Sequence, residues 1–394
     1  MQQGHFLFGA STSAHQIEGG NSNNDWWKWE KKRPKSFQSG AAADSWNRYR
    51  EDIVLAKKLG HSAHRLSLEW SRIETQEGRF NSAAIAHYRE ILQELQANGM
   101  KTFVTLHHFT SPAWLSRKGG WESNETPELF ARYAKKVAQE LGEHVDFWVT
   151  INEPMVYATQ SYMKGVWPPN KKNIFLMLRV IRNLAKGHRM AYRVLHKLRP
   201  RTPIGFAKHV VAYMPESKTK LTDRIAVALY DCFFNHMFFS LLWNMQDFVG
   251  VNYYFTRKLR VTLFPFSISE VALDTPTTDL GWPIYAKGLT QALLHMKRYK
   301  KPIYITENGL ADAADNKRAD FIRSHIRAIE AAQKQGCDVR GYLHWSLIDN
   351  FEWAEGFVPR FGLIEIDYAT QKRTIRKSAY VYKAIIEQSK GVVR

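Results

Sequence analysis

Hydrophobic and polar positions along the chain follow two spacings that alternate. Short apolar runs rich in β-branched and aromatic residues predict eight buried strands, at Phe6–Ala10, Ala63–Leu68, Thr102–Leu106, Phe147–Ile151, Ile204–Ala207, Phe248–Asn252, Ile303–Thr306 and Gly341–Trp345. Longer segments with apolar residues every three or four positions predict helices, at Ala43–Leu59, Ser82–Asn98, Pro127–Gly142, Ile174–Leu198, Leu221–Leu242, Ala286–Tyr299, Arg318–Gln335 and Lys377–Gln388. Strands and helices therefore alternate along nearly the whole chain.

The helix predicted over Ser82–Asn98 shows the pattern most clearly. Apolar residues between Ile85 and Leu95 recur at the helical spacing and would face the core. Asn81 before the segment is a suitable N-cap, and Gly99 after it is a suitable residue for leaving the helix. The segment therefore has both a start and a stop signal.

Eight strand-then-helix units favour an α/β fold built on a parallel sheet, and eight is the number that closes a (β/α)8 TIM barrel. A doubly wound open sheet is the alternative. The first strand is not followed by the glycine-rich phosphate loop that is typical of dinucleotide-binding sheets of that kind. Because no low-complexity linker interrupts the pattern, we expect residues 1–394 to form a single barrel domain.

Composition narrows the class of protein. Of 394 residues, 44% are hydrophobic and 24% charged, which excludes a disordered chain. We expect no membrane-spanning helix and no signal peptide, because the chain lacks a long uninterrupted apolar run and a basic leader. Cys232 and Cys337 make neither a disulfide framework nor a metal-ligand spacing. These features predict a cytoplasmic protein with no metal and no other cofactor.

The charge balance raises the question of an anionic partner. The chain has 56 Lys and Arg residues against 37 Asp and Glu, a formal net charge of +19. Such an excess is typical of proteins that bind nucleic acids, but the basic residues are dispersed and accompany no recognition motif. We therefore expect a solvated basic surface with no specific nucleic-acid partner and no membrane partner.

Polar residues gather where the predicted strands end, which is the edge of a barrel that carries active sites. In chain order they are Gln16, Glu18, Arg65, Glu69, His107, His108, Asn152, Glu153, Asn252, Tyr254, Glu307, Asn308 and Trp345. Hydrogen-bonding groups with aromatic surfaces among them suit a sugar, whose hydroxyl groups need polar partners and whose C–H face stacks on an indole ring. The ring of residues therefore indicates a carbohydrate ligand, with His107 expected to be structural.

Two carboxylates stand out in this ring. Glu153 ends the fourth strand and precedes Pro154, which stops ladder pairing, and Glu307 ends the seventh strand beside a turn-forming Asn-Gly. Either glutamate alone has an ordinary explanation as a salt-bridged or solvated residue. As a pair at matching strand ends, they fit glycoside hydrolysis, which needs one acid and one nucleophile or base.

Several stretches carry a resemblance to a known family. They are FLFGASTSAHQIEGG, HRLSLEWSRI, TLHHFTSPAWL, WVTINEP, DFVGVNYY, GWPIYAKGL, PIYITENG and GYLHWSLIDNFEWAEGFVPRFGL, in this order along the chain. The sequence resembles glycoside hydrolase family 1, the β-glucosidase and β-galactosidase family of (β/α)8 barrels. TINEP and ITENG together are highly specific, and the matching stretches span nearly the whole chain.

The resemblance implies a retaining mechanism. It makes Glu307 the nucleophile and Glu153 the acid/base, with Arg65 and Tyr254 holding Glu307 ionised and oriented. In retaining enzymes the two carboxyl groups lie about 5–5.5 Å apart. The negative charge on Glu307 is expected to raise the pKa of Glu153 and keep it protonated until the glycosyl bond forms.

The resemblance also assigns substrate-binding roles. Asn152 would reach the 2-hydroxyl, Trp345 would form the stacking floor, Phe361 would lie beside the 6-position and Trp282 would border the leaving group. The residues implied to bind sugar hydroxyl groups are Gln16, His108, Asn152, Glu352 and Trp353. Ordinary explanations remain open: Gln16 and Asn152 could cap neighbouring backbone, His108 could be a core histidine, and Trp345 could be barrel packing.

The chain departs from the family pattern at one place. Only Trp243–Gln246 separate the predicted helix Leu221–Leu242 from the strand beginning at Asp247, where family members usually carry several tens more residues. We therefore expect a barrel shortened between its fifth and sixth units, with a less enclosed site and low turnover. The aromatic run Phe233–Trp243 would either be partly uncovered or pack under the short connection.

The expected function is a retaining β-glycosidase that acts on small-molecule β-D-glucosides and tolerates β-fucosides and β-galactosides. A 6-phospho-β-glucosidase is the rival within the family, and Glu352 with Trp353 argues against it because a carboxylate would repel phosphate. A transglycosylase on the same site and a non-catalytic carbohydrate- or polyanion-binding barrel also stay open at this point. The sequence gives no indication of the oligomeric state.

Overall fold

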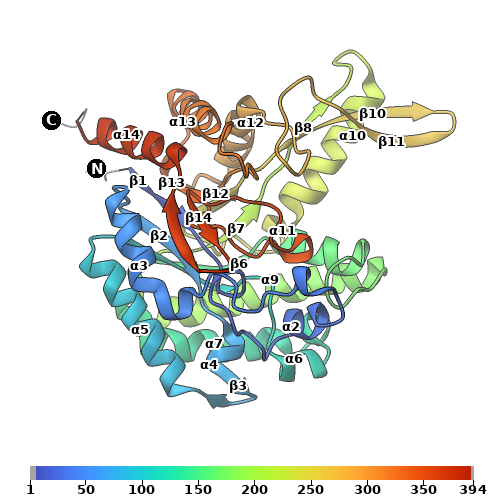
Figure 1. The fold of residues 1–394 in the computed structure, drawn as a ribbon. Coiled ribbons are helices and arrows are strands. Elements are labelled where there is room, and N and C mark those ends of the chain that lie inside the picture. Colours follow the sequence, from blue (N-terminus) through green and yellow to red (C-terminus); the bar gives the residue numbers. More distant parts are fainter. Residues whose placement is uncertain (1–5, 392–394) are drawn as a thin grey trace.

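The computed structural model describes residues 6–391 and shows eight parallel strands closed into a barrel (Figure 1). The strands are β1 (Leu7–Ser11), β2 (Ala63–Ser67), β5 (Lys101–His107), β6 (Phe147–Asn152), β7 (Ile204–His209), β9 (Val249–Asn252), β12 (Ile303–Asn308) and β13 (Val339–Trp345). Each pairs with its neighbours in chain order, and β13 pairs with β1 to close the ring. The predicted (β/α)8 barrel is confirmed, and the doubly wound alternative is wrong.

Helices surround the barrel and follow most of the predicted segments (Figure 1). The long ones are α3 (Ser45–Lys58), α5 (Ser82–Ala97), α7 (Thr126–Leu141), α9 (Ile174–Leu198), α10 (Leu221–Tyr230), α12 (Ala286–Met296), α13 (Arg318–Lys334) and α14 (Lys377–Gly391). Asn81 caps α5 as predicted, because its side-chain oxygen accepts a hydrogen bond from the backbone N–H of Ala84 at 3.1 Å. Gly99 follows with a φ of 74°, a conformation that favours glycine.

Shorter elements cover the carboxyl ends of the barrel strands, and the sequence pattern did not predict them. They are α1 (Ala14–Ile17), α2 (Asp25–Glu30), α4 (Trp70–Ile73), β3 (Glu74–Gln76), β4 (Arg79–Phe80), α6 (Ala113–Arg117), α8 (Pro154–Ala158), β8 (Ala212–Pro215), β10 (Thr256–Leu263), β11 (Phe266–Val271), β14 (Ile364–Asp367) and β15 (Lys372–Ile375). Their lengths of two to eight residues are too short for periodicity to separate them from loops.

The interior of the barrel changes character along its axis. One end is apolar, with a cluster that includes Phe103, Phe248 and Tyr304, and the rings of Phe103 and Phe147 stack at 4.1 Å between centroids. At the carboxyl end the interior side chains are polar and just as deeply buried, as for Arg65, whose exposed fraction is 0%. A buried charge is costly unless it is paired, so this end of the barrel requires a satisfied polar network.

The shortened fifth unit leaves the barrel closed. The predicted helix Leu221–Leu242 is divided into α10, a π-helical segment η5 (Asp231–His236) and α11 (Met237–Ser240). After α11 the chain reaches β9, which pairs directly with β7. The question of closure that the short connection raised is therefore answered by a complete ring.

Both predicted fates of the aromatic run occur in the structure. Phe238, Phe239 and Leu242 are buried, and the rings of Phe238 and Phe239 lie 5.2 Å and 4.9 Å from that of Phe206 in β7. Trp243 is 66% exposed, and the guanidinium of Arg189 lies 4.1 Å from the centre of its ring. The run packs at its middle and is uncovered at its end.

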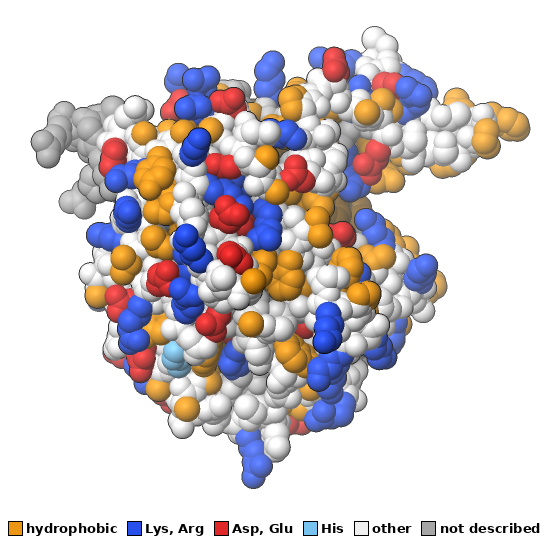
Figure 2. Space-filling model, viewed as in Figure 1, with side chains coloured by type: hydrophobic (Ala, Val, Ile, Leu, Met, Phe, Trp, Pro, Cys, Tyr) orange, Lys and Arg blue, Asp and Glu red, His pale blue; other side chains and the backbone are white. Residues whose placement is uncertain are grey.

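Lysine and arginine side chains are scattered over the face shown in Figure 2, with acidic side chains among them. The β10–β11 hairpin projects from the body, and its turn carries Leu263, Phe264 and Phe266 with exposed fractions of 63%, 97% and 72%. Among the helices formed by residues 6–391, we find none with the length and hydrophobicity needed to cross a membrane.

Candidate active site

A cavity of about 670 Å³ opens at the carboxyl ends of the barrel strands. Ten of the twelve residues that the sequence assigned to the site line it: His108, Asn152, Glu153, Tyr254, Trp282, Glu307, Trp345, Glu352, Trp353 and Phe361. The remaining two, Gln16 and Arg65, are buried and contact residues that line the cavity. The structure therefore brings the whole predicted set together.

Glu307 lies near the end of β12 and is held by two donors. The Arg65 guanidinium donates to Oε1 at 2.5 Å, and the Tyr254 hydroxyl donates to Oε2 at 2.7 Å. Gly309 permits the close approach of the chain to β13, because a Cβ there would lie 1.7 Å from the carbonyl oxygen of Trp345. Both carboxylate oxygens of Glu307 are thus fixed by side chains from other strand ends.

Glu153 directly follows β6 and precedes Pro154, the first residue of α8. Its φ of 44° is in the left-handed region, which is uncommon for a residue other than glycine and is found at functional sites. The side-chain amide of Asn252 donates to Oε1 at 2.8 Å, and Nδ1 of His209 lies 3.6 Å from the same oxygen. The turn after β6 therefore holds this carboxyl group in the cavity.

The two carboxyl groups have different electrostatic surroundings. Burial, together with the negative charge of Glu307, raises the pKa of Glu153 to about 8. Burial also raises the pKa of Glu307, but the Arg65 charge and the Tyr254 hydrogen bond act in the opposite direction. Those donors stabilise the ionised form of Glu307, so a proton shared by the pair is favoured on Glu153.

Asn152 connects the network. Its carbonyl oxygen accepts hydrogen bonds from Arg65 at 2.7 Å and from Asn252 at 3.1 Å, which leaves its amide to donate to Nε2 of His108 at 3.1 Å. Burial lowers the pKa of His108 well below its usual range, so its ring is neutral and Nε2 can accept. The orientations of the two side chains are therefore coupled.

His107 has a different environment from His108. It is absent from the described lining of the cavity, and the indole N–H of Trp121 donates to its Nε2 at 3.0 Å. This contact agrees with the expectation of a structural residue.

Gln16 and Glu352 form a second polar corner. The Gln16 amide donates to Asn350 Oδ1 and to the carbonyl of Phe351, both at 2.9 Å, and to Glu352 Oε2 at 3.3 Å. Burial and the nearby carboxylates of Glu307 and Glu153 raise the pKa of Glu352 to about 8. Glu352 lines the cavity, and Gln16 is fully buried and contacts it from behind the wall.

Aromatic rings form the remaining walls. The ring of His108 is stacked near those of Trp345 and Trp353, with centroids 6.0 Å and 5.9 Å away. The ring of Phe361 lies 6.3 Å from that of Trp282, which is only half-buried. The inner walls thus combine flat rings with fixed hydrogen-bonding groups, a mixture that suits a sugar ring.

The outer wall contains residues that the sequence analysis missed. Among the lining residues are several from β7, β8, α10, η5 and the start of β10: His209, Tyr213, Tyr230, Phe233, Phe234 and Phe255. For His209 a signal existed, because a polar Lys-His pair follows the predicted end of the fifth strand. For the aromatic residues no signal existed, because their elements are short.

The chemistry available in the cavity is that of carboxylic acids. Burial and a neighbouring charge favour the protonated form of Glu153, two donors favour the ionised form of Glu307, and amides and rings surround both. Among residues 6–391, one group of side chains has the spacing of metal ligands: Asp231, His236 and His295. None of the three lines the cavity. Acid–base and nucleophilic catalysis by the carboxyl groups is the chemistry this arrangement supports.

Comparison with known proteins decides the family. The sequence model of glycosyl hydrolase family 1 matches residues 2–243 and 234–391. The chain belongs to glycosyl hydrolase family 1. As a member of this family it is a glycoside hydrolase, and with 394 residues it is shorter than its relatives. The two matched segments overlap over residues 234–243, in η5, α11 and the turn that leads into the short connection.

Solved and curated members of family 1 resemble the chain over nearly its full length. The structure of a beta-glycosidase from Pyrococcus horikoshii is 42% identical, covers 98% of this chain and 94% of its own, and superimposes with a TM-score of 0.92. Beta-glucosidase A of Thermotoga maritima is 32% identical over 98% of this chain and 97% of its own. A 6-phospho-beta-galactosidase of Clostridium acetobutylicum is 30% identical over 98% and 97%.

Proposed function

We propose that this family 1 hydrolase is a retaining β-glycosidase that hydrolyses β-D-glucosides and tolerates β-fucosides and β-galactosides. The observation that carries the proposal is the unequal pair of buried glutamates. Arg65 and Tyr254 stabilise the charge on Glu307, whereas burial and that charge keep the proton on Glu153. A double displacement needs this division between a nucleophile and an acid.

In the first step Glu307 attacks the anomeric carbon and forms a glycosyl–enzyme ester. The bond from that carbon to the leaving oxygen breaks, and Glu153 transfers its proton to this oxygen, so the aglycone departs as a neutral alcohol. Esterification removes the negative charge of Glu307. The pKa of Glu153 then falls, because one of the two causes that raise it has disappeared.

In the second step the ionised Glu153 takes a proton from a water molecule. The resulting oxygen nucleophile attacks the anomeric carbon from the face that the aglycone left, and Glu307 departs as a carboxylate. Two inversions give a product with the configuration of the substrate. Asn252 and His209 would orient Glu153 in both steps, since both lie within reach of its Oε1.

Sugar recognition is assigned to the inner walls of the cavity. Asn152 would bind the 2-hydroxyl, and Gln16 with Glu352 would bind hydroxyl groups at the opposite edge of the ring, where O4 differs between glucose and galactose. His108 and Trp353 would bind further hydroxyl groups, Trp345 would stack against the sugar face, and Phe361 would lie beside the 6-position. Trp282 would border the leaving group.

A preference for 6-phosphorylated sugars is the competing assignment, because one relative is named as a 6-phospho-beta-galactosidase. Glu352 argues against it, since burial and two neighbouring carboxylates already disfavour further negative charge there. The lysine and arginine among the described lining residues are Lys164 and Arg257, and Arg257 is paired with Glu270 at 2.6 Å. A phosphate dianion would thus meet an acidic group without a free arginine beside it.

Initial rates on a matched panel of substrates test the proposal. The panel contains the same aryl leaving group on β-glucose, β-fucose, β-galactose and 6-phospho-β-glucose, with the Glu307→Gly variant as a background control. We expect the unphosphorylated sugars to react faster than the phosphorylated one, and the variant to be inactive. Faster cleavage of the phosphorylated sugar would overturn the glucoside assignment, and binding without turnover would point to a non-catalytic barrel.

A further inference from the structure

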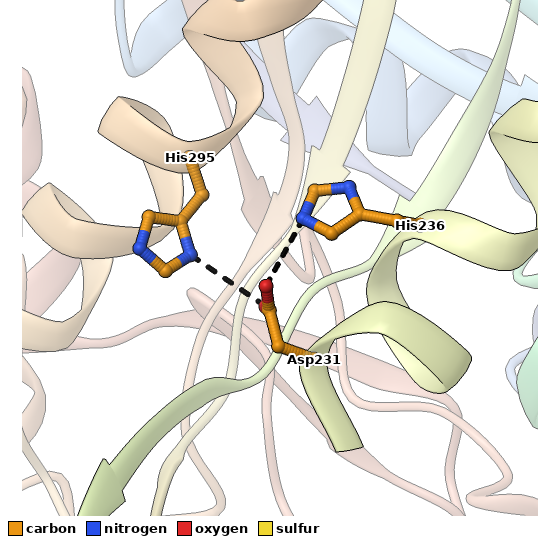
Figure 3. Close-up of side chains that lie close together, drawn as sticks. All are labelled: Asp231, His236 and His295. Atoms are coloured by element: carbon orange, nitrogen blue, oxygen red, sulfur yellow. Dashed lines mark ion pairs between the residues drawn. The ribbon is translucent and has the colours of Figure 1, made fainter. Parts of the chain in front are cut away.

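Three potential metal ligands converge outside the catalytic cavity (Figure 3). Asp231 and His236 come from η5, and His295 comes from α12. His236 Nε2 lies 3.2 Å from Asp231 Oδ2, His295 Nδ1 lies 3.6 Å from Asp231 Oδ1, and the three donor atoms all lie within 4.8 Å of one another. In Figure 3 both rings are directed at the same carboxylate.

Neighbouring groups orient two of the three side chains. The hydroxyl of Tyr299 lies 2.6 Å from Nδ1 of His236, so this ring nitrogen is occupied and Nε2 faces Asp231. Among the described residues, Nε2 of His236 has no hydrogen bond of good geometry. The amide of Asn235 donates to Asp231 Oδ1 at 2.7 Å. Second partners of this kind fix the tautomer and orientation of metal-binding side chains.

We propose that Asp231, His236 and His295 bind one divalent transition-metal ion, with Zn²⁺ as the best fit. Imidazole nitrogen and carboxylate oxygen bind zinc at about 2.0–2.2 Å, and tetrahedral geometry then separates neighbouring donors by about 3.3–3.5 Å. The two histidines approach different oxygens of Asp231, at 3.2 Å and 3.6 Å, and the three ligand atoms lie within 4.8 Å of one another. Rotation of the side chains can bring them to the tetrahedral spacing. Water would complete the coordination, because His295 is exposed.

The position of the site suggests its purpose. The ion would link α12 to η5, which precedes α11 and the connection that is short in this chain. Phe233 and Phe234, which line the outer wall of the cavity, lie on η5 between Asp231 and His236. The bound ion therefore stabilises the folded chain and fixes this wall. It has no part in the chemical steps, since none of its ligands lines the cavity.

Titration calorimetry with Zn²⁺ alone tests the proposal on full-length protein that has been treated with a chelator. We expect one ion per chain and a rise in the thermal unfolding temperature that grows with zinc concentration. His295→Ala removes an exposed ligand that packs against little, so the variant should fold, lose at least about tenfold in affinity and lose the temperature shift. Tyr299→Phe should weaken binding by roughly 10- to 100-fold, because only the orientation of His236 changes.

Two matched variants separate this site from adventitious binding. His196→Ala removes another surface histidine that is paired with an aspartate, at 2.9 Å from Asp247, and Cys232→Ser removes the exposed thiol next to Asp231. Both should keep one tight zinc ion. Unchanged zinc affinity in His295→Ala, loss of the ion in either control, or no binding to the wild type at submillimolar zinc would overturn the proposal. None of these outcomes depends on glycoside hydrolysis.

Discussion

The inner and outer ends of the catalytic cavity are built in different ways. At the inner end, donors from separate barrel strands hold each carboxyl group, as Arg65 of β2 and Tyr254 after β9 do for Glu307 of β12. At the outer end, Tyr230, Phe233 and Phe234 come from one short stretch of chain and present rings without such a polar network. The first region depends on the closure of the barrel, and the second on the length of one connection.

The comparison explains why the family pattern survives the shortening. A missing segment after η5 leaves the pairing of β7 with β9 intact, so all strand ends at the inner end keep their register. The aromatic residues of the outer end, in contrast, come from α10 and η5, the elements that precede the short connection. We therefore expect large losses of activity from substitutions at the inner end and small changes in substrate preference from those at the outer end.

The largest effect is expected from the two glutamates themselves. Glu307→Gly should lower hydrolysis by more than the roughly 10²–10⁴-fold that acid–base catalysis contributes, because no glycosyl–enzyme can form. Glu153→Ala should spare substrates with activated aryl leaving groups, which need little protonation, and azide should partly restore its turnover. Steady-state rates on activated and unactivated glucosides measure the difference. Equal losses on all substrates without rescue by azide would contradict the assignments.

Loss of one donor to the nucleophile should have the next largest effect. Burial and the charge of Glu307 raise the pKa of Tyr254, so its hydroxyl stays protonated and donates. A hydrogen bond to a charged group contributes about 1.5–3 kcal/mol, so Tyr254→Phe should lower kcat roughly 10- to 150-fold. Tyr253→Phe is the control, because the Tyr253 hydroxyl contacts Thr256 and the backbone of Tyr285 instead. A similar fall in kcat for both variants would indicate a general loss of structure.

The pH dependence should show which glutamate holds the proton. The first step needs protonated Glu153, whose pKa is raised to about 8, so kcat/KM on an unactivated glucoside should fall about tenfold per pH unit above that value. In Glu153→Gln the alkaline limb should vanish on activated substrates, since the titrating group is gone. Persistence of the limb in this variant would assign it to another residue.

A small effect is expected at the outer wall. Phe234→Ala removes a half-buried ring from the outer wall. Because this ring is only partly enclosed, KM for aryl glucosides should rise by less than about tenfold, which is less than the change that a lost contact causes in an enclosed apolar pocket. KM for methyl β-glucoside and kcat for both substrates should stay near wild-type values. The measurement is kcat and KM for the aryl and the methyl β-glucoside in the same variant. A fall in kcat comparable to that of Tyr254→Phe would remove the distinction between the two ends.

The short connection provides the finest test of the comparison. An incompletely covered mouth admits water and leaves the site less preorganised, so we expect low turnover for this family. Inserting a family-length segment between Leu242 and Asp247, or adding it as a separate peptide, should raise kcat with Glu153 and Glu307 unchanged. Turnover at the ordinary family level in the unaltered chain would show that the closed barrel alone is sufficient.

The sequence predicted the inner end far better than the outer end. The eight strands were visible as apolar runs, and six of the thirteen polar or aromatic residues noted at the strand ends line the cavity: His108, Asn152, Glu153, Tyr254, Glu307 and Trp345. Some strands were predicted to end too early. The fifth was predicted to end at Ala207, but Lys208 and His209, which depart from the apolar pattern, continue β7. The division of the fifth helix by η5 and the strands β8 and β10 depend on tertiary packing, which periodicity does not encode.

The configuration of the first product tests the central claim most directly. Proton NMR of a β-glucoside during early hydrolysis distinguishes the two anomers of glucose before they interconvert in solution. Retention by double displacement, with Glu307 as nucleophile and Glu153 as acid/base, predicts that β-glucose appears first. Initial formation of α-glucose would mean a single inverting displacement and would contradict the roles assigned to both glutamates.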